Sequence, residues 1–102
     1  MIARVASFEG VNVEAAEQSA DEADAIIRPL VENLSGYSGH LQLLAPNGRF
    51  LSITLFDSEE NAEAAESTFD EEMPRRLADL FREWAGRRVS VDRYKVLADE
   101  RR

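Results

Sequence analysis

The chain contains no cysteine, only one histidine and no long run of apolar residues. Without cysteine it can form no disulfide, thiolate nucleophile or thiolate metal site, and this composition suits a reducing compartment. We therefore expect a cytoplasmic protein. The N-terminal stretch MIARVASF has no extended apolar core or small-residue cleavage site, and no later segment approaches the ~18 apolar residues that span a bilayer. The sequence predicts neither secretion nor membrane insertion.

Basic residues are scarce in the first two thirds of the chain. Residues 9–72 hold fifteen acidic side chains and two basic ones, whereas residues 73–102 hold nine basic and five acidic side chains. The net charge of −8 argues against nucleic acid or an anionic membrane as a partner, because phosphates would be repelled. The asymmetry favours docking of the last third beside the acidic helices, in its own subunit or in a second one. The alternative is a solvated acidic helix face.

The length of 102 residues and the hydrophobic content of 44% fit one globular domain with a modest core. We expect residues 1–98 to form this domain and residues 99–102 to form a frayed basic tail. No glycine-rich phosphate loop or nucleophile elbow is present in the sequence. The acidic side chains at 59, 60, 63 and 66 have no histidine among them, so we interpret them as a solvated helix face and expect no metal.

Hydrophobic periodicity predicts a strand, a helix and a hairpin in the first half of the chain. Residues 2–8 form a β-type run, and Asn12 can cap a helix whose apolar stripe continues to residue 34. Pro29 falls inside this helix, where we expect a kink or a restart. Residues 40–45 and 49–56 are predicted to pair as antiparallel strands around a tight connection.

The second half is predicted to contain two helices and a last strand. Asp57, with Glu60 three residues later, forms a capping box that would start the first helix. A second helix is expected to begin at Pro74 and to stop at Gly86. Residues 89–97 then alternate as a strand. The order β-α-β-β-α-α-β predicts an α+β domain with a four-stranded antiparallel sheet and helices on one face.

Both faces of the strand at 49–56 carry large apolar residues. Leu51, Ile53 and Leu55 point to one side. Phe50, Ser52, Thr54 and Phe56 point to the other. Because helices cover only one face, a monomer would expose a patch of several hundred square ångströms, so we expect a homodimer that packs through its sheet faces.

Three stretches, RPLVENLSGYSGHLQLL, LSITLFDSEENAEA and VDRYKVL, together resemble the antibiotic biosynthesis monooxygenase-like family. That family belongs to the superfamily of dimeric ferredoxin-like α+β barrels. The resemblance implies a ferredoxin-like fold and a dimeric barrel. Its members include cofactor-independent oxygenases of polycyclic aromatic phenols, haem-degrading enzymes and proteins with no known activity, so the function has to be argued from the site.

The chain departs from the family pattern at the positions that carry chemistry. Relatives commonly have a tryptophan where this chain has Phe56. Haem-degrading members also use an asparagine on the first strand and a histidine on the second helix, whereas here the first strand offers Ser7 and Phe8 and the second helix has no histidine. These departures argue against haem degradation, and we expect no cofactor.

Five residues are candidates for a site. His40 and Tyr94 are the candidate catalytic residues, for proton transfer, although a lone histidine can be structural or merely exposed. Arg4, Phe56 and Trp84 are the candidate ligand-binding residues. Arg4 lies among apolar neighbours, so it either pairs with a carboxylate or binds an anionic or phenolate-like ligand. The aromatic side chains could stack on a ligand or supply packing alone.

Two functions therefore remain open. In the first, the protein binds or oxygenates a small aromatic or polyketide-like molecule without a cofactor. In the second, it is a non-catalytic homodimeric module whose same residues fill its core and its interface. A pocket of at least ~300 Å³ with converging polar groups would favour the first, and a filled core would favour the second.

Overall fold

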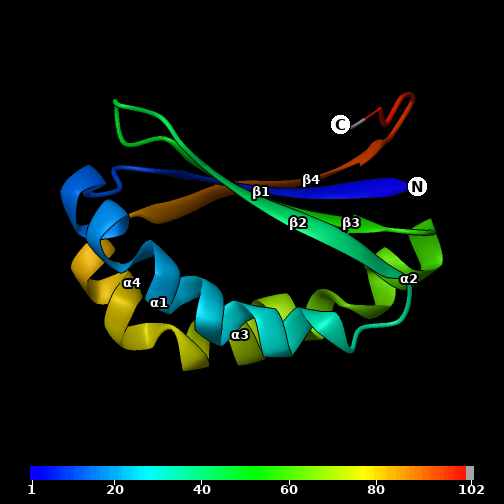
Figure 1. The fold of residues 1–102 in the computed structure, drawn as a ribbon, viewed down its shortest axis with the longest axis horizontal. Coiled ribbons are helices and arrows are strands. Elements are labelled where there is room, and N and C mark those ends of the chain that lie inside the picture. Colours follow the sequence, from blue (N-terminus) through cyan, green and yellow to red (C-terminus); the bar gives the residue numbers. More distant parts are fainter. Residues whose placement is uncertain (101–102) are drawn as a thin grey trace.

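The computed structural model describes residues 1–100, so the last two residues of the expected tail at 99–102 lie outside the described residues. The strands are β1 (Ile2–Glu9), β2 (Tyr37–Leu44), β3 (Phe50–Phe56) and β4 (Arg87–Lys95), in the spatial order β2-β3-β1-β4. All neighbouring strands pair antiparallel. The helices form a second layer on one face of this sheet (Figure 1). The predicted α+β architecture is confirmed.

Helix α1 (Val13–Glu32) begins at the predicted residue, but its bend lies at a different residue from the predicted one. The side chain of Asn12 accepts a hydrogen bond from the Ala15 amide at 3.0 Å, which confirms the cap. The expected break at Pro29 is wrong, because the non-helical geometry lies at Ser19 (φ −115°, ψ 16°). The Ser19 hydroxyl donates to the Ala15 carbonyl at 2.8 Å and so competes with the helical backbone bonds. Pro29 is exposed, where water can satisfy the carbonyl that it leaves unpaired.

The helix after β3 is capped one residue later than the sequence predicts. The cap of α2 (Glu59–Ala64) is Ser58, whose hydroxyl accepts from the Asn61 amide at 3.2 Å, so the expected Asp57–Glu60 capping box is wrong. The Asp57 amide is already used, since it donates to the Gly36 carbonyl at 2.8 Å. This bond extends the sheet by one position and moves the helix start.

The second helical stretch is broken rather than continuous. It consists of α2, the π-helical turn η1 (Thr68–Glu72), α3 (Met73–Arg76) and α4 (Ala78–Trp84). Pro74 lies at the start of α3, close to the predicted position. Helix α4 ends at Trp84, and its cap is Ala85, which adopts a left-handed conformation (φ 61°), one residue before the predicted stop at Gly86. Gly86 is required for a different reason, since a Cβ atom there would lie 2.4 Å from a Val11 methyl group.

The core lies between the sheet and the helices. Its most deeply buried large side chains are Phe56, Leu77 and Val31. The other face of the sheet is uncovered in the single chain, and Leu41 on β2 is 53% exposed there. None of the helices in the described part of the chain is long and apolar enough to cross a membrane.

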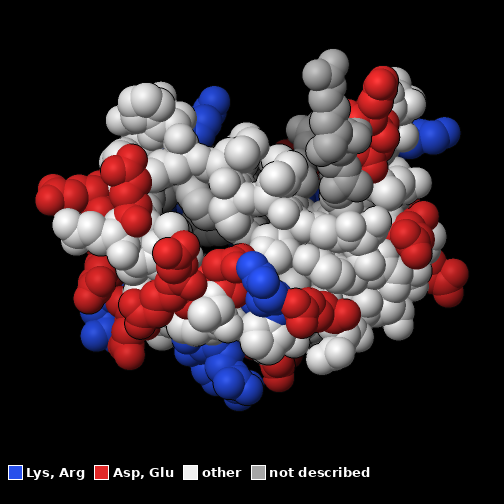
Figure 2. Space-filling view, in the orientation of Figure 1, with Lys and Arg blue, Asp and Glu red and all other residues white. Residues whose placement is uncertain are grey.

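The charge asymmetry of the sequence is used within one chain. Acidic side chains gather over the helical layer (Figure 2). Two arginines of β4 form ion pairs with side chains of this layer. Arg88 contacts Asp70 at 3.0 Å and Arg93 contacts Glu59 at 2.8 Å. These ion pairs confirm that the basic last third of the chain docks on the acidic helices of its own subunit.

Candidate functional site

A cavity of about 500 Å³ lies between the sheet and the helices. Alanines on the inner face of α1 leave this space open, since their side chains stop at Cβ where a leucine would fill the gap. The α1 alanines that line the cavity are Ala16, Ala20 and Ala23. Aromatic rings of the sheet and the later helices, Phe8, Phe50, Phe69, Phe81 and Trp84, complete most of its wall. The core is therefore not filled.

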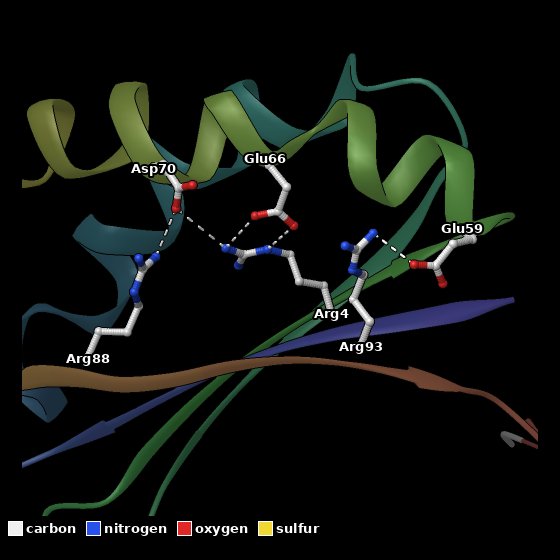
Figure 3. A network of polar contacts seen from close by, with 6 residues as sticks. All are labelled: Arg4, Glu59, Glu66, Asp70, Arg88 and Arg93. Atoms are coloured by element: carbon white, nitrogen blue, oxygen red, sulfur yellow. Dashed lines mark hydrogen bonds and ion pairs between the residues drawn. The ribbon is translucent and has the colours of Figure 1, made fainter.

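Arg4 brings a buried charge to one end of the cavity. It is 2% exposed, and its guanidinium contacts both carboxylate oxygens of Glu66, at 3.1 and 3.3 Å (Figure 3). The same guanidinium lies 4.0 Å from the centre of the Phe69 ring, within cation–π range. Asp70 stands between Arg4, at 4.0 Å, and Arg88. The expected pairing of Arg4 with a carboxylate is confirmed, and Arg4 also lines the cavity.

Trp84 forms a wall of the cavity at its opposite side. Its ring packs edge-on against Phe50, with centroids 5.6 Å apart, and it is 6% exposed. Its indole N–H donates to the Ser19 hydroxyl at 2.8 Å, so the break in α1 supplies the partner of the only tryptophan. The ring face, rather than the N–H group, is what Trp84 can offer to a bound molecule.

Gln42 on β2 is a cavity residue that sequence reasoning did not single out. Its side-chain oxygen is buried and has no hydrogen-bond partner among the described residues. An unpaired buried amide oxygen costs about 1–3 kcal/mol, so a ligand that supplies a donor here would gain an unusually favourable hydrogen bond. The available signal was position alone, since Gln42 shares the inner strand face with His40 and Leu44.

A second hollow of about 580 Å³, which we call the outer hollow, adjoins the cavity between α1 and β2. Asp24 and Gln42 line both spaces. In the outer hollow His40 lies between two partners: Nδ1 is 2.5 Å from the Tyr37 hydroxyl and Nε2 is 2.9 Å from Asp24 Oδ1. The other oxygen of Asp24 accepts a hydrogen bond from Arg28.

The protonation of this chain of side chains follows from its surroundings. The hydrogen bond with His40 lowers the pKa of Asp24, and Arg28 adds to the effect against the opposing influence of burial. Burial raises the pKa of Tyr37, which keeps the phenol protonated. We assign the Nε2 proton of His40 to the bond with the ionised Asp24, so Nδ1 accepts from the Tyr37 hydroxyl.

No protein-family model and no curated protein matches the sequence. Solved structures do match. A dimeric ferredoxin-like protein from an uncultured marine organism has a TM-score of 0.72 and 16% identity, over 99% of this chain and 98% of the other. A candidate antibiotic biosynthesis monooxygenase from Deinococcus radiodurans has a TM-score of 0.66 and 12% identity, over 99% of this chain and 97% of the other. A heme-degrader from Mycobacterium tuberculosis, solved with two hemes in its active site, has a TM-score of 0.67 and 19% identity, over 98% of this chain and 99% of the other.

This chain has the ferredoxin-like fold of antibiotic biosynthesis monooxygenase-type proteins. The predicted fold is confirmed over nearly the whole chain. At 12–19% identity the similarity extends to the fold only, and the chemistry depends on the residues of the site.

Within this ferredoxin-like fold, the five predicted site residues lie in four different places. Arg4 and Trp84 line the cavity, and His40 lines the adjoining outer hollow. Phe56 is fully buried, packs edge-on against Phe69 and is not part of the cavity wall. Tyr94 is 55% exposed and pairs with Ala3 on the strand positions that alternate with the cavity-facing Arg4. Residues 1–100 contain no cluster of three or more acidic, histidine or cysteine side chains that could hold a metal ion.

Proposed function

We propose that this protein binds a small, largely apolar and planar molecule in the cavity, and that it acts on it as a cofactor-independent monooxygenase-like enzyme. The observation that carries the proposal is a cavity of about 500 Å³ on which polar groups converge. Cavities of this size with a few polar groups in an apolar wall are typical of small-molecule sites. The filled-core alternative would leave both the space and the unpaired Gln42 oxygen unexplained.

The composition of the wall supports an aromatic ligand. Rings of Phe50 and Trp84 offer stacking or edge contacts at one side, and Arg4 offers a charge at the other. Gln42 between them supplies a hydrogen-bonding group that favours a ligand with a polar substituent. A haem ligand is less well supported, because the single histidine of the chain is already held by Tyr37 and Asp24.

Filling the cavity should abolish binding without unfolding the protein. We expect Ala23→Leu to weaken the binding of 2-naphthol, a planar phenol, at least tenfold, because Ala23 is buried and its side chain borders the open space. Equilibrium dialysis measures the binding, and native mass spectrometry of the freshly purified protein detects any retained molecule.

Ala65→Leu is the matched control. Ala65 is also buried but does not border the cavity, so the added carbon atoms would overpack the core and lower stability by about 1–3 kcal/mol. Binding should survive in this variant below its melting temperature. Equal binding of 2-naphthol by wild type and Ala23→Leu would contradict the proposed site.

We also propose that the uncovered sheet face forms a homodimer. Support comes from the exposure of Leu41 and Leu43 on β2, at 53% and 46%, and from the ferredoxin-like neighbour that is dimeric. Ile53 lies beside Leu41 in the register, at the centre of this face. A face of this kind buried against its copy would account for large apolar side chains on both sides of β3.

A charge on the sheet face should dissociate the dimer. Ile53→Glu would place an unpaired carboxylate between two apolar sheets, so we expect a monomer at micromolar concentration by light scattering after size-exclusion chromatography. Ala25→Glu is the control, since Ala25 is exposed on α1, in the helical layer that covers the opposite face of the sheet. A wild-type protein that is monomeric throughout would refute this mode of assembly.

A further inference from the structure

We propose that Tyr37, His40 and Asp24 form a proton relay that removes a proton from a weakly acidic hydroxyl group of the bound molecule. The inference rests on the proposed function, since it assigns the acid–base groups of that same site. It places them in the outer hollow, beside the apolar cavity rather than inside it. Two members of the relay, Tyr37 and Asp24, are not among the five candidate site residues.

The geometry has the three parts that a base of this kind needs. Tyr37 lines the outer hollow, and its hydroxyl is the group that the relay would present to a ligand. His40 Nδ1, 2.5 Å away, is the proton acceptor, and Asp24, 2.9 Å from Nε2, fixes the ring and its tautomer. A contact group, a base and a carboxylate that orients the base are the arrangement by which weakly acidic hydroxyl groups are activated in enzymes.

The proton balance requires no other reactant. The ligand hydroxyl gives its proton to the oxygen of Tyr37 and keeps the bonding electron pair as an anion. Tyr37 passes its own proton to Nδ1 of His40 and remains a neutral phenol. His40 then carries two N–H groups, and its positive charge lies against the carboxylate of Asp24.

Charged side chains surround the relay on the α1 side. From α1, Asp21, Asp24 and Glu32 line the outer hollow together with one cation, Arg28. Among the described residues of β2 the titratable neighbour is Tyr37, and the residue paired with His40 on β3 is Thr54, which does not titrate. Three carboxylates and one guanidinium of α1 therefore line the hollow around the relay, and Asp24 is the carboxylate bonded to the ring. Arg28 is held by Asp24 and does not compete for the ring.

The two hollows adjoin, which lets one molecule use both. Asp24 and Gln42 line the cavity and the outer hollow alike. A ligand whose ring system fills the cavity can therefore direct a hydroxyl group past Gln42 toward Tyr37. The amide of Gln42 would position this group, and the relay would ionise it.

The experiment uses 4-nitrophenol, whose ionised form has a distinct absorbance. Equilibrium dialysis against the whole protein measures the bound fraction at each pH, and the absorbance measures the ionised fraction of the bound probe. We expect the bound probe to ionise about one pH unit lower than the free probe, a tenfold change in the ratio of its two forms. At a pH where the probe is neutral, Tyr37→Phe and Asp24→Asn should bind it within about threefold of wild type, and the ionisation shift should disappear.

Two further measurements separate a relay from a structural tie between α1 and β2. Glu83→Gln removes the same single charge from an exposed site that borders neither hollow, and the shift should persist in it. Because His40 is the only histidine, ring ¹⁵N shifts read its tautomer directly. We expect an Nε2–H signal in wild type and its weakening in Asp24→Asn.

Each outcome decides a defined point. A probe that binds and ionises as it does in solution, in wild type and variants alike, overturns the relay and leaves the proposed function intact. A wild-type protein that binds neither 4-nitrophenol nor 2-naphthol overturns both. An Nδ1–H tautomer at neutral pH also overturns the relay, because Tyr37 would then have no acceptor in His40.

Discussion

Phe56→Ala is expected to lower the free energy of unfolding by about 3–5 kcal/mol, the range for a fully buried phenylalanine. Phe56 has no exposed surface and packs edge-on against Phe69, with ring centroids 6.3 Å apart. Removing the ring leaves a void between β3 and η1 that the surrounding backbone cannot close. Urea denaturation followed by circular dichroism measures the change.

Phe50→Ala is the matched comparison, since Phe50 lies on the same face of the same strand. Phe50 borders the cavity and contacts Phe8 and Trp84, whereas Phe56 does not border it. We expect Phe50→Ala to cost less stability, because its ring is only partly buried, and to reduce 2-naphthol binding more. The folded Phe56→Ala variant should bind 2-naphthol with the wild-type affinity.

The opposite pattern would restore the role that the sequence suggests for Phe56. A Phe56→Ala protein that keeps wild-type stability but fails to bind 2-naphthol would make Phe56 a ligand wall. The strand-to-helix corner at 56–59 would then be part of the site. In the structure this corner is explained by backbone bonding, the Ser58 cap and core packing.

The sequence was sufficient to predict the architecture, because the patterns that indicate each element are short-range. Alternation at 49–56 predicts the two faces of β3, and the buried Thr54 and Phe56 confirm the inner one. Helical spacing predicts α1, and the Asn12 cap fixes its start. These signals act within one or two turns of chain, so a single sequence contains them.

The site could be predicted only in part, because its contacts join residues far apart in the chain. Arg4 meets Glu66 across 62 positions, and Trp84 meets Ser19 across 65. The sequence identifies Arg4 as a charge that needs a partner but cannot identify the partner. His40 is conspicuous as the sole histidine, whereas Asp24 is one of fifteen acidic residues in 9–72 and becomes distinctive only once α1 lies over β2.

The incorrect predictions at Pro29 and Asp57 also arise because the deciding contacts join residues far apart in the chain. The expected break at Pro29 followed from a general cost of proline in helices, but the chain bends at Ser19, where a hydroxyl bonded to the backbone also receives the Trp84 indole. The cap moved from Asp57 to Ser58 because the Asp57 amide pairs with Gly36. In both cases a tertiary contact outweighs a local preference.

Glu66→Ala is expected to lower the free energy of unfolding by about 3 kcal/mol, because it strands the charge of Arg4 in the core. The Arg4 side chain is 3% exposed, and without Glu66 its nearest carboxylate would be Asp70 at 4.0 Å. Arg4→Met should cost less, within about 1 kcal/mol. The methionine keeps the packing against Phe69, and the Glu66 side chain is 31% exposed, so water can solvate it. Chemical denaturation of both variants measures the difference.

This asymmetry also tests whether Arg4 is available to a ligand. If the ion pair serves stability alone, Arg4→Met should bind 2-naphthol and 2-naphthoate, each with its wild-type affinity. If Arg4 also anchors the bound molecule, Arg4→Met should lose affinity for the carboxylate probe about tenfold more than for the phenol, because the guanidinium would form a charge-assisted bond only with the anion. Equal stability losses in Glu66→Ala and Arg4→Met would contradict the buried-charge account. Such a result would mean that an unpaired Glu66 costs as much stability as an unpaired Arg4, although the Glu66 side chain is far more exposed to water.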